Sequence, residues 1–124
     1  MDIDDRRAKG EQLQERMRPG MTAHLASRFT GPAADFGRYS TEILFGEMWQ
    51  RGGLDIRSRE IAVLSALIAQ REMRDLRVHV PIALNLGLTR DEIYEIVYQL
   101  ALYVGWPRAG EVFALLDEVF EGID

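Results

Sequence analysis

The stretch from Ile61 to Ala69 constrains the fold more than any other part of the sequence, because Ser65 is its only polar residue. We expect a helix over about residues 57–69, and over this stretch that helix is apolar on every side. A helix of this kind is stable only when other elements surround it. It must therefore lie at the centre of the fold.

Glycine and proline residues mark turns in the rest of the chain, at 18–20, 31–32, 52–53, 87 and 105–107. The segments between them have helical periodicity, and none has to be a strand. Helices are expected over about residues 35–50 and 72–86. A further helix should begin after the Thr89/Glu92 capping box, and the last one should begin at Pro107. Residues 4–17 are polar and weakly periodic, so they form either a loose surface helix or an arm that orders against a partner subunit.

The sequence thus predicts one all-α domain over residues 1–124, a compact arrangement of about six helices. Its parts are an N-terminal arm at 1–33 and a helical core at 34–122. The helix after Thr89 is apolar on two faces, one with Ile93, Ile96, Val97 and Leu100 and one with Tyr94, Tyr98 and Leu102. In so small a domain we expect one face to pack on the core and the other on a neighbouring subunit.

Composition excludes several classes of function. The chain has no cysteine, so disulfides, thiolate metal sites and thiol chemistry are excluded. Its net charge is −5 with scattered basic residues, which disfavours nucleic acid as a partner. No stretch of eighteen apolar residues is present and the N-terminus is acidic, so we expect neither a membrane span nor a signal peptide, and a cytoplasmic location.

Three polar residues, Glu47, Glu60 and His79, stand where periodicity predicts burial. Each has a structural explanation: Glu47 can pair with an arginine, Glu60 can complement a helix dipole, and His79 can donate to a backbone carbonyl. Their joint presence, with Arg57 and Arg59 close to Glu60 in sequence, favours a functional site. The stripe on residues 35–50 that includes Glu47 otherwise consists of apolar residues (Phe36, Tyr39, Ile43).

Other candidate sites are weaker. Trp49, Tyr103 and Trp106 can line a pocket or belong to the core. The chain has two histidines, His24 and His79, whose spacing does not suggest metal ligands, so no metal site is expected.

Five segments, taken in order, resemble the carboxymuconolactone decarboxylase family. They are 45–47 (Phe-Gly-Glu), 53–60 (Gly-Leu-Asp-Ile-Arg-Ser-Arg-Glu), 76–79 (Leu-Arg-Val-His), 83–93 (Ala-Leu-Asn-Leu-Gly-Leu-Thr-Arg-Asp-Glu-Ile) and 103–107 (Tyr-Val-Gly-Trp-Pro). The resemblance extends over roughly residues 35–120. It implies an all-α, alkylhydroperoxidase-like fold that assembles as homotrimers or homohexamers, with active sites near subunit contacts.

The same resemblance separates two branches of the superfamily. Alkylhydroperoxidase-like members have a Glu, a Cys-x-x-Cys pair, and a His nineteen residues after that Glu. Glu60 and His79 keep this spacing, whereas Glu72 and Asp75 stand where the two cysteines would be. Thiol peroxidase chemistry is therefore excluded, and the decarboxylase branch, which needs no cofactor, remains.

The resemblance implies a cofactor-independent decarboxylase, a lyase of aromatic compound degradation, that acts on a small carboxylated lactone such as 4-carboxymuconolactone. In that hypothesis His79 is the acid or proton shuttle, Glu60 orients it or shares its proton, and Arg57 or Arg59 holds a carboxylate. The remaining candidates for substrate binding are Glu47, Trp49, Tyr103 and Trp106.

Two alternatives stay open. Pro81 and Trp106 depart from the family pattern, which favours another lyase, an isomerase or a cyclase on the same scaffold. The second alternative is a non-catalytic oligomeric binding module. Its function would depend on the polar N-terminal arm and on the second apolar face of the helix after Thr89.

Overall fold

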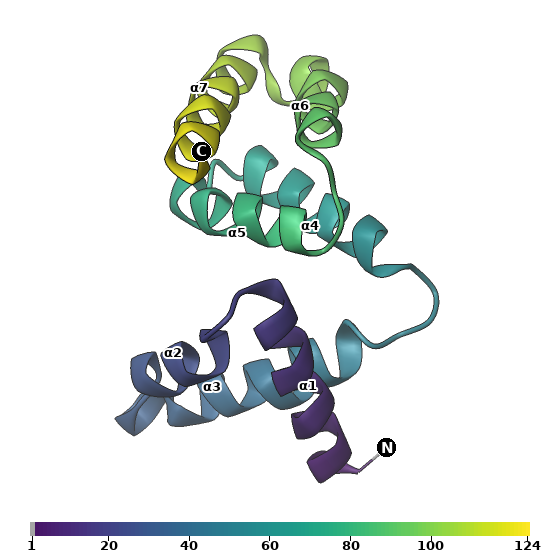
Figure 1. The fold of residues 1–124 in the computed structure, drawn as a ribbon, viewed down its shortest axis with the longest axis vertical. Helices are drawn as coiled ribbons and strands as arrows, with labels where there is room; N and C mark the ends of the chain where they lie inside the picture. Colours follow the sequence, from purple (N-terminus) through teal and green to yellow (C-terminus); the bar gives the residue numbers. More distant parts are fainter. Residues whose placement is uncertain (1) are drawn as a thin grey trace. The chain divides into compact units, whose positions relative to one another are not determined.

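The computed structural model describes residues 2–124, and every regular element in that range is a helix. Seven α-helices, one 3₁₀ turn and one π-helical segment make up this part of the chain (Figure 1). The all-α fold class is thus confirmed, with seven α-helices in the described range instead of about six. None of the described helices is long and apolar enough to cross a membrane. The chain divides into two units, of which the first ends at Asp55 and the second begins at Ile56.

The first unit contains α1 (Ile3–Met17), α2 (Met21–Arg28), η1 (Gly31–Ala33), α3 (Ala34–Tyr39) and the π-helical η2 (Ser40–Met48). The side chain of Asp2 caps α1 by accepting a hydrogen bond from the Asp5 amide (2.8 Å). Gln14, which is buried, donates to the Thr41 hydroxyl (2.9 Å) and accepts from the Thr22 hydroxyl (2.8 Å). Residues 4–17 are therefore helical, and α1 is bonded to both α2 and η2.

Two glycines allow α1 and η2 to pack backbone against backbone. A Cβ atom at Gly10 would lie 2.1 Å from the Thr41 carbonyl oxygen, and a Cβ atom at Gly46 would lie 2.2 Å from the Arg6 carbonyl oxygen. Both distances are far shorter than any real carbon–oxygen contact. Only glycine fits at these two positions.

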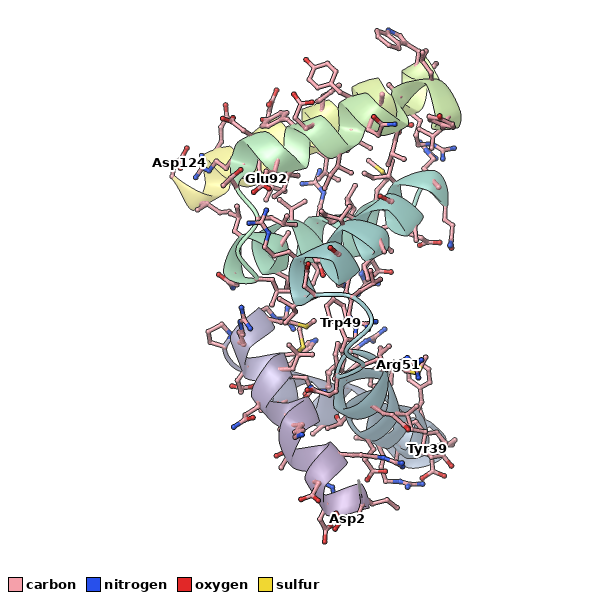
Figure 2. The ribbon with its side chains drawn as sticks, turned by 90° about the vertical axis from the view of Figure 1, so that its right-hand side faces the viewer. Asp2, Tyr39, Trp49, Arg51, Glu92 and Asp124 are labelled. Atoms are coloured by element: carbon pink, nitrogen blue, oxygen red, sulfur yellow. The ribbon has the colours of Figure 1, made fainter. Side chains whose placement is uncertain are left out.

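The buried face of residues 35–50 differs from the prediction. Phe36, Tyr39 and Ile43 were expected to be buried, but they are 61%, 48% and 44% exposed (Tyr39 is labelled in Figure 2). The buried positions are Glu42 and Gly46. For Ile43 the reason is the switch to π-helical bonding from Ser40 onward, which widens the turn beyond the 3.6 residues that periodicity assumes, whereas Phe36 and Tyr39 precede this switch on α3.

The second unit contains α4 (Ile56–Ala69), α5 (Met73–Asn85), α6 (Arg90–Val104) and α7 (Trp106–Ile123). These bounds agree closely with the predicted helices. The Thr89/Glu92 capping box forms at the start of α6, with hydrogen bonds of 2.9 and 3.1 Å. Asp124 and Glu92 lie at the same end of the α6–α7 pair (Figure 2), where Asp124 pairs with Arg90 (2.5 Å).

A single cluster of apolar side chains forms the core of the second unit. Each of its four helices contributes to this cluster, for example Leu64 (α4), Val80 (α5), Val97 (α6) and Val112 (α7). The helix expected to be apolar on every side is covered on only part of its surface, because Ala62, Ala66 and Ala69 are exposed. These three residues have small side chains, so their exposure leaves little apolar area in water.

Polar contacts from α7 hold the hairpin of α4 and α5. Arg71, between these helices, forms a bidentate pair with Glu111 (3.1 and 2.7 Å). Arg77 on α5 pairs with Glu118 (2.5 Å). Arg108 donates to the carbonyl of Ala69 at the end of α4 (2.8 Å). The contacts from α7 thus hold the corner of the hairpin and the first half of α5.

Candidate functional site

The helices α4 and α5 bring Glu60 and His79 into direct contact. His79 Nδ1 lies 2.8 Å from Glu60 Oε1, which is a hydrogen bond between residues nineteen apart in the sequence. The Glu60 side chain is fully buried, whereas the His79 side chain is 23% exposed. Sequence reasoning paired these two residues, and the structure places one carboxyl group and one imidazole side by side.

The second carboxyl oxygen of Glu60 is a clear anomaly. Oε2 is buried and has no hydrogen-bond partner among the described residues. A buried carboxylate oxygen without a donor is costly, so such groups are rare and associated with function. When Glu60 is ionised, His79 donates its Nδ1–H to Oε1, and Nε2 remains for exchange of a proton with a ligand.

Arg57 belongs to the same side of α4 as Glu60, since the two are three residues apart in a helix. Its guanidinium forms an ion pair with Glu92, the capping residue of α6. Hydrogen bonding with the backbone and side chain of Thr89, and to a lesser extent the charge of Arg57, lowers the pKa of Glu92 below its ordinary value of 4.5. Arg59 is partly exposed on the same helix.

The other predicted residues do not join Glu60 and His79 in a contact that the structure shows. Glu47 belongs to the first unit, where it is 46% exposed and pairs with Arg6 (3.4 Å). It was expected to be buried, and the ion pair matches the structural explanation offered for it. Trp49 follows η2 and is partly buried, whereas Tyr103 and Trp106 are 83% and 68% exposed.

Sequence reasoning missed Glu42, the one acidic residue of the described first unit that is buried. Its side chain is 5% exposed and accepts contacts from Arg7 (3.2 Å) and Arg38 (3.5 Å). The spacing of Arg38 and Glu42, four residues apart on a predicted helix, was the signal that could have found it.

Tyr94 also differs from the prediction that it faces a neighbouring subunit. It donates a hydrogen bond to Asp117 on α7 (2.6 Å), and its ring lies against Phe113 and Phe120. This hydrogen bond, together with partial burial and the charge of Asp117, raises the pKa of Tyr94 to about 12. Tyr98 and Leu102, from the same predicted face, are 60% and 86% exposed.

Each unit has a pocket on its surface. The pocket of the second unit has a volume of about 490 Å³ and lies between α4 and α6, with Ile61, Ile96 and Leu100 as apolar lining and Glu92 and Glu95 as acidic lining. The pocket of the first unit is described below. Among residues 2–124, no group of three or more His, Cys, Asp or Glu side chains is arranged to hold a metal ion.

Comparison with known proteins identifies the family. The Carboxymuconolactone decarboxylase family matches residues 34–118, a range that includes Glu60 and His79. The 4-carboxymuconolactone decarboxylase of Acinetobacter baylyi is 30% identical over 89 residues, which cover 72% of this chain and 66% of that protein. The nitrosuccinic acid decarboxylase npaB of Metarhizium robertsii is 38% identical over 86 residues, which cover 69% of this chain and 58% of that protein.

A third relative is an uncharacterized 15.0 kDa protein from the nqo9–nqo10 intergenic region of Paracoccus denitrificans. It is 30% identical over 81 residues, which cover 64% of this chain and 60% of that protein. The chain thus spans between 58% and 66% of the length of these three relatives. The family match covers more than half of the chain and agrees with the all-α fold. On this evidence the chain belongs to the carboxymuconolactone decarboxylase family.

Proposed function

We propose that this chain is a cofactor-independent carbon–carbon lyase that releases CO2 from a small carboxylated lactone or acid, such as 4-carboxymuconolactone. The observation that carries the proposal is the contact between a fully buried Glu60 carboxyl and a partly exposed His79 imidazole (2.8 Å). This arrangement suits proton transfer, because the carboxylate fixes the ring while the exposed part of the ring reaches a ligand.

The names of the relatives point to one kind of chemistry. A carboxylated lactone and nitrosuccinic acid differ in structure, but each combines a carboxylate with an electron-withdrawing group. When CO2 leaves such a molecule, the electron pair of the broken carbon–carbon bond moves into the lactone carbonyl or the nitro group. The substrate itself accepts the electrons, which supports a reaction that needs no cofactor.

The protein then has to return one proton to carbon. In the proposed mechanism His79, protonated on both nitrogens beside the Glu60 carboxylate, gives its Nε2 proton to the carbanion and regains a proton from water. Glu60 does not reach the substrate, because it is fully buried, and acts as a positioning residue through His79.

A cation is needed to hold a substrate carboxylate, and Arg57 or Arg59 is proposed for this role. Arg57 shares the face of α4 with Glu60, and its side chain is 46% exposed beside Glu92. A guanidinium has five N–H donors, so its pair with Glu92 leaves donors for a ligand. Glu47, Trp49, Tyr103 and Trp106 remain proposed substrate contacts.

We also propose that the chain assembles as a homotrimer or homohexamer in the cytoplasm, in a pathway that degrades aromatic compounds. Support for assembly comes from the junction of α6 and α7, where Leu102, Tyr103 and Trp106 are 86%, 83% and 68% exposed. Large apolar side chains that cluster in water are typical of protein interfaces.

The test is CO2 release and loss of substrate absorbance with 4-carboxymuconolactone, and CO2 release with nitrosuccinic acid. We expect turnover of at least one substrate by the wild-type protein, and a rate lower by roughly 10²–10⁴-fold in His79→Gln. His24→Gln is the matched control, since His24 is exposed on α2, and it should keep full activity. A folded wild-type protein that decarboxylates neither acid would refute the proposed reaction, and an unchanged rate in His79→Gln would refute the role of His79.

A further inference from the structure

The first unit has a pocket of its own, with a volume of about 300 Å³. It is lined entirely by residues from α1 to η2, and the family residues Glu60 and His79 are not among them. Leu25, Ala26, Phe29 and Ala34 provide the apolar part of its lining. The volume is at the small end of the range for ligand pockets, about 300–1,000 Å³, which suits a ligand smaller than a typical drug molecule.

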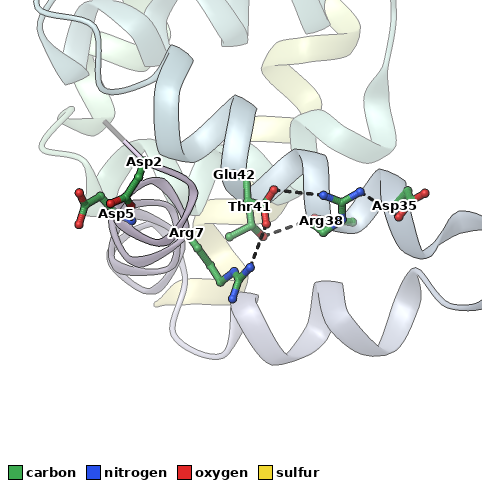
Figure 3. A network of polar contacts seen from close by, with 8 residues as sticks. Asp2, Asp5, Arg7, Asp35, Arg38, Thr41 and Glu42 are labelled. Carbon is green, nitrogen blue, oxygen red and sulfur yellow. Dashed lines mark hydrogen bonds and ion pairs between the residues drawn. The ribbon is translucent and has the colours of Figure 1, made fainter.

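Two arginines and a buried glutamate form the polar part of this pocket. Arg7 from α1 and Arg38 from α3 converge on Glu42 of η2 (Figure 3), each contacting a different carboxylate oxygen (3.2 and 3.5 Å). Arg38 also donates to Asp35 (3.1 Å), and this hydrogen bond raises the pKa of Arg38, so its charge is kept. The carboxylate of Glu42 thus holds together two guanidinium groups from different helices.

The polar groups that a ligand can reach in this pocket are mainly donors. The side chains of Arg7 and Arg38 are 50% and 46% exposed, whereas that of Glu42 is 5% exposed and both of its oxygens are occupied. Each guanidinium has five N–H donors, and within the described residues Arg7 uses one of them and Arg38 two. Glu11 also lines the pocket and is partly exposed, so a cation is the competing class of ligand.

We propose that this pocket is a binding site for a small carboxylate with an apolar body. Arg7 and Arg38 bind the carboxylate through their remaining N–H groups, and the apolar body lies against Leu25 and Phe29. Glu42 holds both guanidinium groups in place, one at each of its carboxylate oxygens, so that little side-chain entropy is lost when a ligand binds. The site requires no turnover and is independent of the lyase reaction proposed above.

The experiment is a titration of the ¹⁵N-labelled chain of residues 1–124 with 3-phenylpropionate, followed by two-dimensional amide NMR. We expect saturable shifts concentrated at residues that line the pocket, such as Thr22, Gly37 and Thr41. Two probes with a similar body separate the ligand classes: 3-phenylpropanamide lacks the charge and 2-phenylethylamine reverses it. The carboxylate should bind at least roughly tenfold more tightly than either, because charge-assisted hydrogen bonds to arginine are lost in both.

Substitutions of the two arginines test whether these residues bind the carboxylate. Arg7→Gln and Arg38→Gln should each weaken 3-phenylpropionate binding by roughly tenfold or more, while Arg16→Gln, an exposed change on the same helix as Arg7, should leave it unchanged. Removing one arginine leaves Glu42 with a single partner and can destabilise the unit. Ala26→Phe therefore serves as a second test, because it fills the pocket from an exposed position and keeps every charge.

Loss of binding in folded Ala26→Phe and in the two arginine variants, but not in Arg16→Gln, would support the site. The proposal would be overturned by equal binding of 3-phenylpropanamide, by tighter binding of 2-phenylethylamine, or by shifts centred on His79. Absence of saturable binding up to about 10 mM carboxylate would overturn it as well. Because none of these measurements depends on turnover, absence of carboxylate binding at this pocket is distinguishable from absence of the proposed lyase activity.

Discussion

Glu60 combines two properties that seldom occur together in a purely structural residue. Its side chain is fully buried, yet one carboxyl oxygen has no partner among the described residues. Its other carboxyl oxygen, Oε1, contacts His79 Nδ1 (2.8 Å), so the orientation of the imidazole depends on this buried carboxyl group.

Glu60→Gln tests the positioning role of this residue. An amide of the same shape can still accept a hydrogen bond from His79, but it no longer stabilises the imidazolium. We expect kcat of the decarboxylation to fall by roughly 10²-fold or more, with a smaller change in KM and an altered pH profile. A purely structural role for Glu60 predicts the opposite pattern, in which the thermal midpoint falls and the pH profile of the remaining activity does not change.

At the level of elements, the contact of α1 with η2 depends on two residues that have no side chain. Because backbone oxygens lie 2.1 and 2.2 Å from the positions that a Cβ would occupy at Gly10 and Gly46, no rotamer change can relieve the overlap. The two helices would have to separate. Such a separation would also affect Glu42, whose partner Arg7 is on α1 and whose partner Arg38 precedes η2.

Gly46→Ala should therefore destabilise the protein by about 1–3 kcal/mol, in the range for overpacking. Gly110→Ala on α7 is the matched control, because, apart from its chain neighbours and the backbone of its own helix, no atom of the described residues lies within 4 Å of the position that its Cβ would take. There the gain in helix propensity should stabilise the protein by about 0.5–1 kcal/mol. Chemical denaturation of both variants measures these changes, and the same sign for the two substitutions would contradict the packing described for α1 and η2.

Three carboxylates on the second unit have lowered pKa values, and each is at the end of a helix or links two helices. Hydrogen bonding from Thr89 lowers the pKa of Glu92. Hydrogen bonds from arginine lower the other two pKa values, from Arg71 for Glu111 and from Arg90 for Asp124. A group whose pKa is lower in the folded state stabilises the fold above its unfolded-state pKa, and this contribution is lost as the pH falls through the folded-state pKa.

We therefore expect the free energy of unfolding to decrease as the pH falls below the ordinary values of 4.5 for glutamate and 3.8 for aspartate. In Glu92→Gln this decrease should be smaller, because the substituted side chain no longer titrates. Denaturant titrations at a series of pH values measure the effect. An identical acid dependence in the variant would show that the capping carboxylate contributes nothing to it.

Local signals in the sequence predicted the second unit better than the first. The capping box of Thr89 and Glu92 marks the start of α6 because it depends on residues three apart. The pair of Glu60 and His79, which the structure joins, was implied by the resemblance to the family and not by a local signal. By contrast, π-helical bonding across residues 40–48 leaves no trace in a pattern of period 3.6. The burial of Glu42 in place of Glu47 results from contact with α1 at Gly46, a tertiary effect that periodicity cannot show.

In the whole molecule, large apolar side chains on α6 and at its junction with α7 are exposed. Tyr98 on α6 is an example, since its ring contacts Phe113 (4.9 Å between centroids) and still remains 60% exposed. An aromatic side chain that packs on one side and is open on the other is suited to contact with another protein surface.

Leu102→Ser should lower the oligomeric state of the protein, since Leu102 is 86% exposed in the single chain. Ile123→Ser removes an aliphatic side chain of similar size near the C-terminus, where it is 47% exposed, and should leave the assembly intact. Sedimentation velocity at micromolar concentration distinguishes the species. A wild-type protein that sediments as a monomer would rule out the proposed assembly.

The hairpin of α4 and α5 has an evolutionary consequence. Glu60 and His79 come from two consecutive helices that are separated only by residues 70–72, and the bidentate pair of Arg71 with Glu111 anchors that corner. The pair to which we assign proton transfer is thus encoded in one short stretch of the gene, while other segments can supply the walls around a substrate. Under that proposal, mutations elsewhere can change specificity without disturbing the pair, so inheritance of the chemistry and divergence of specificity become separable events.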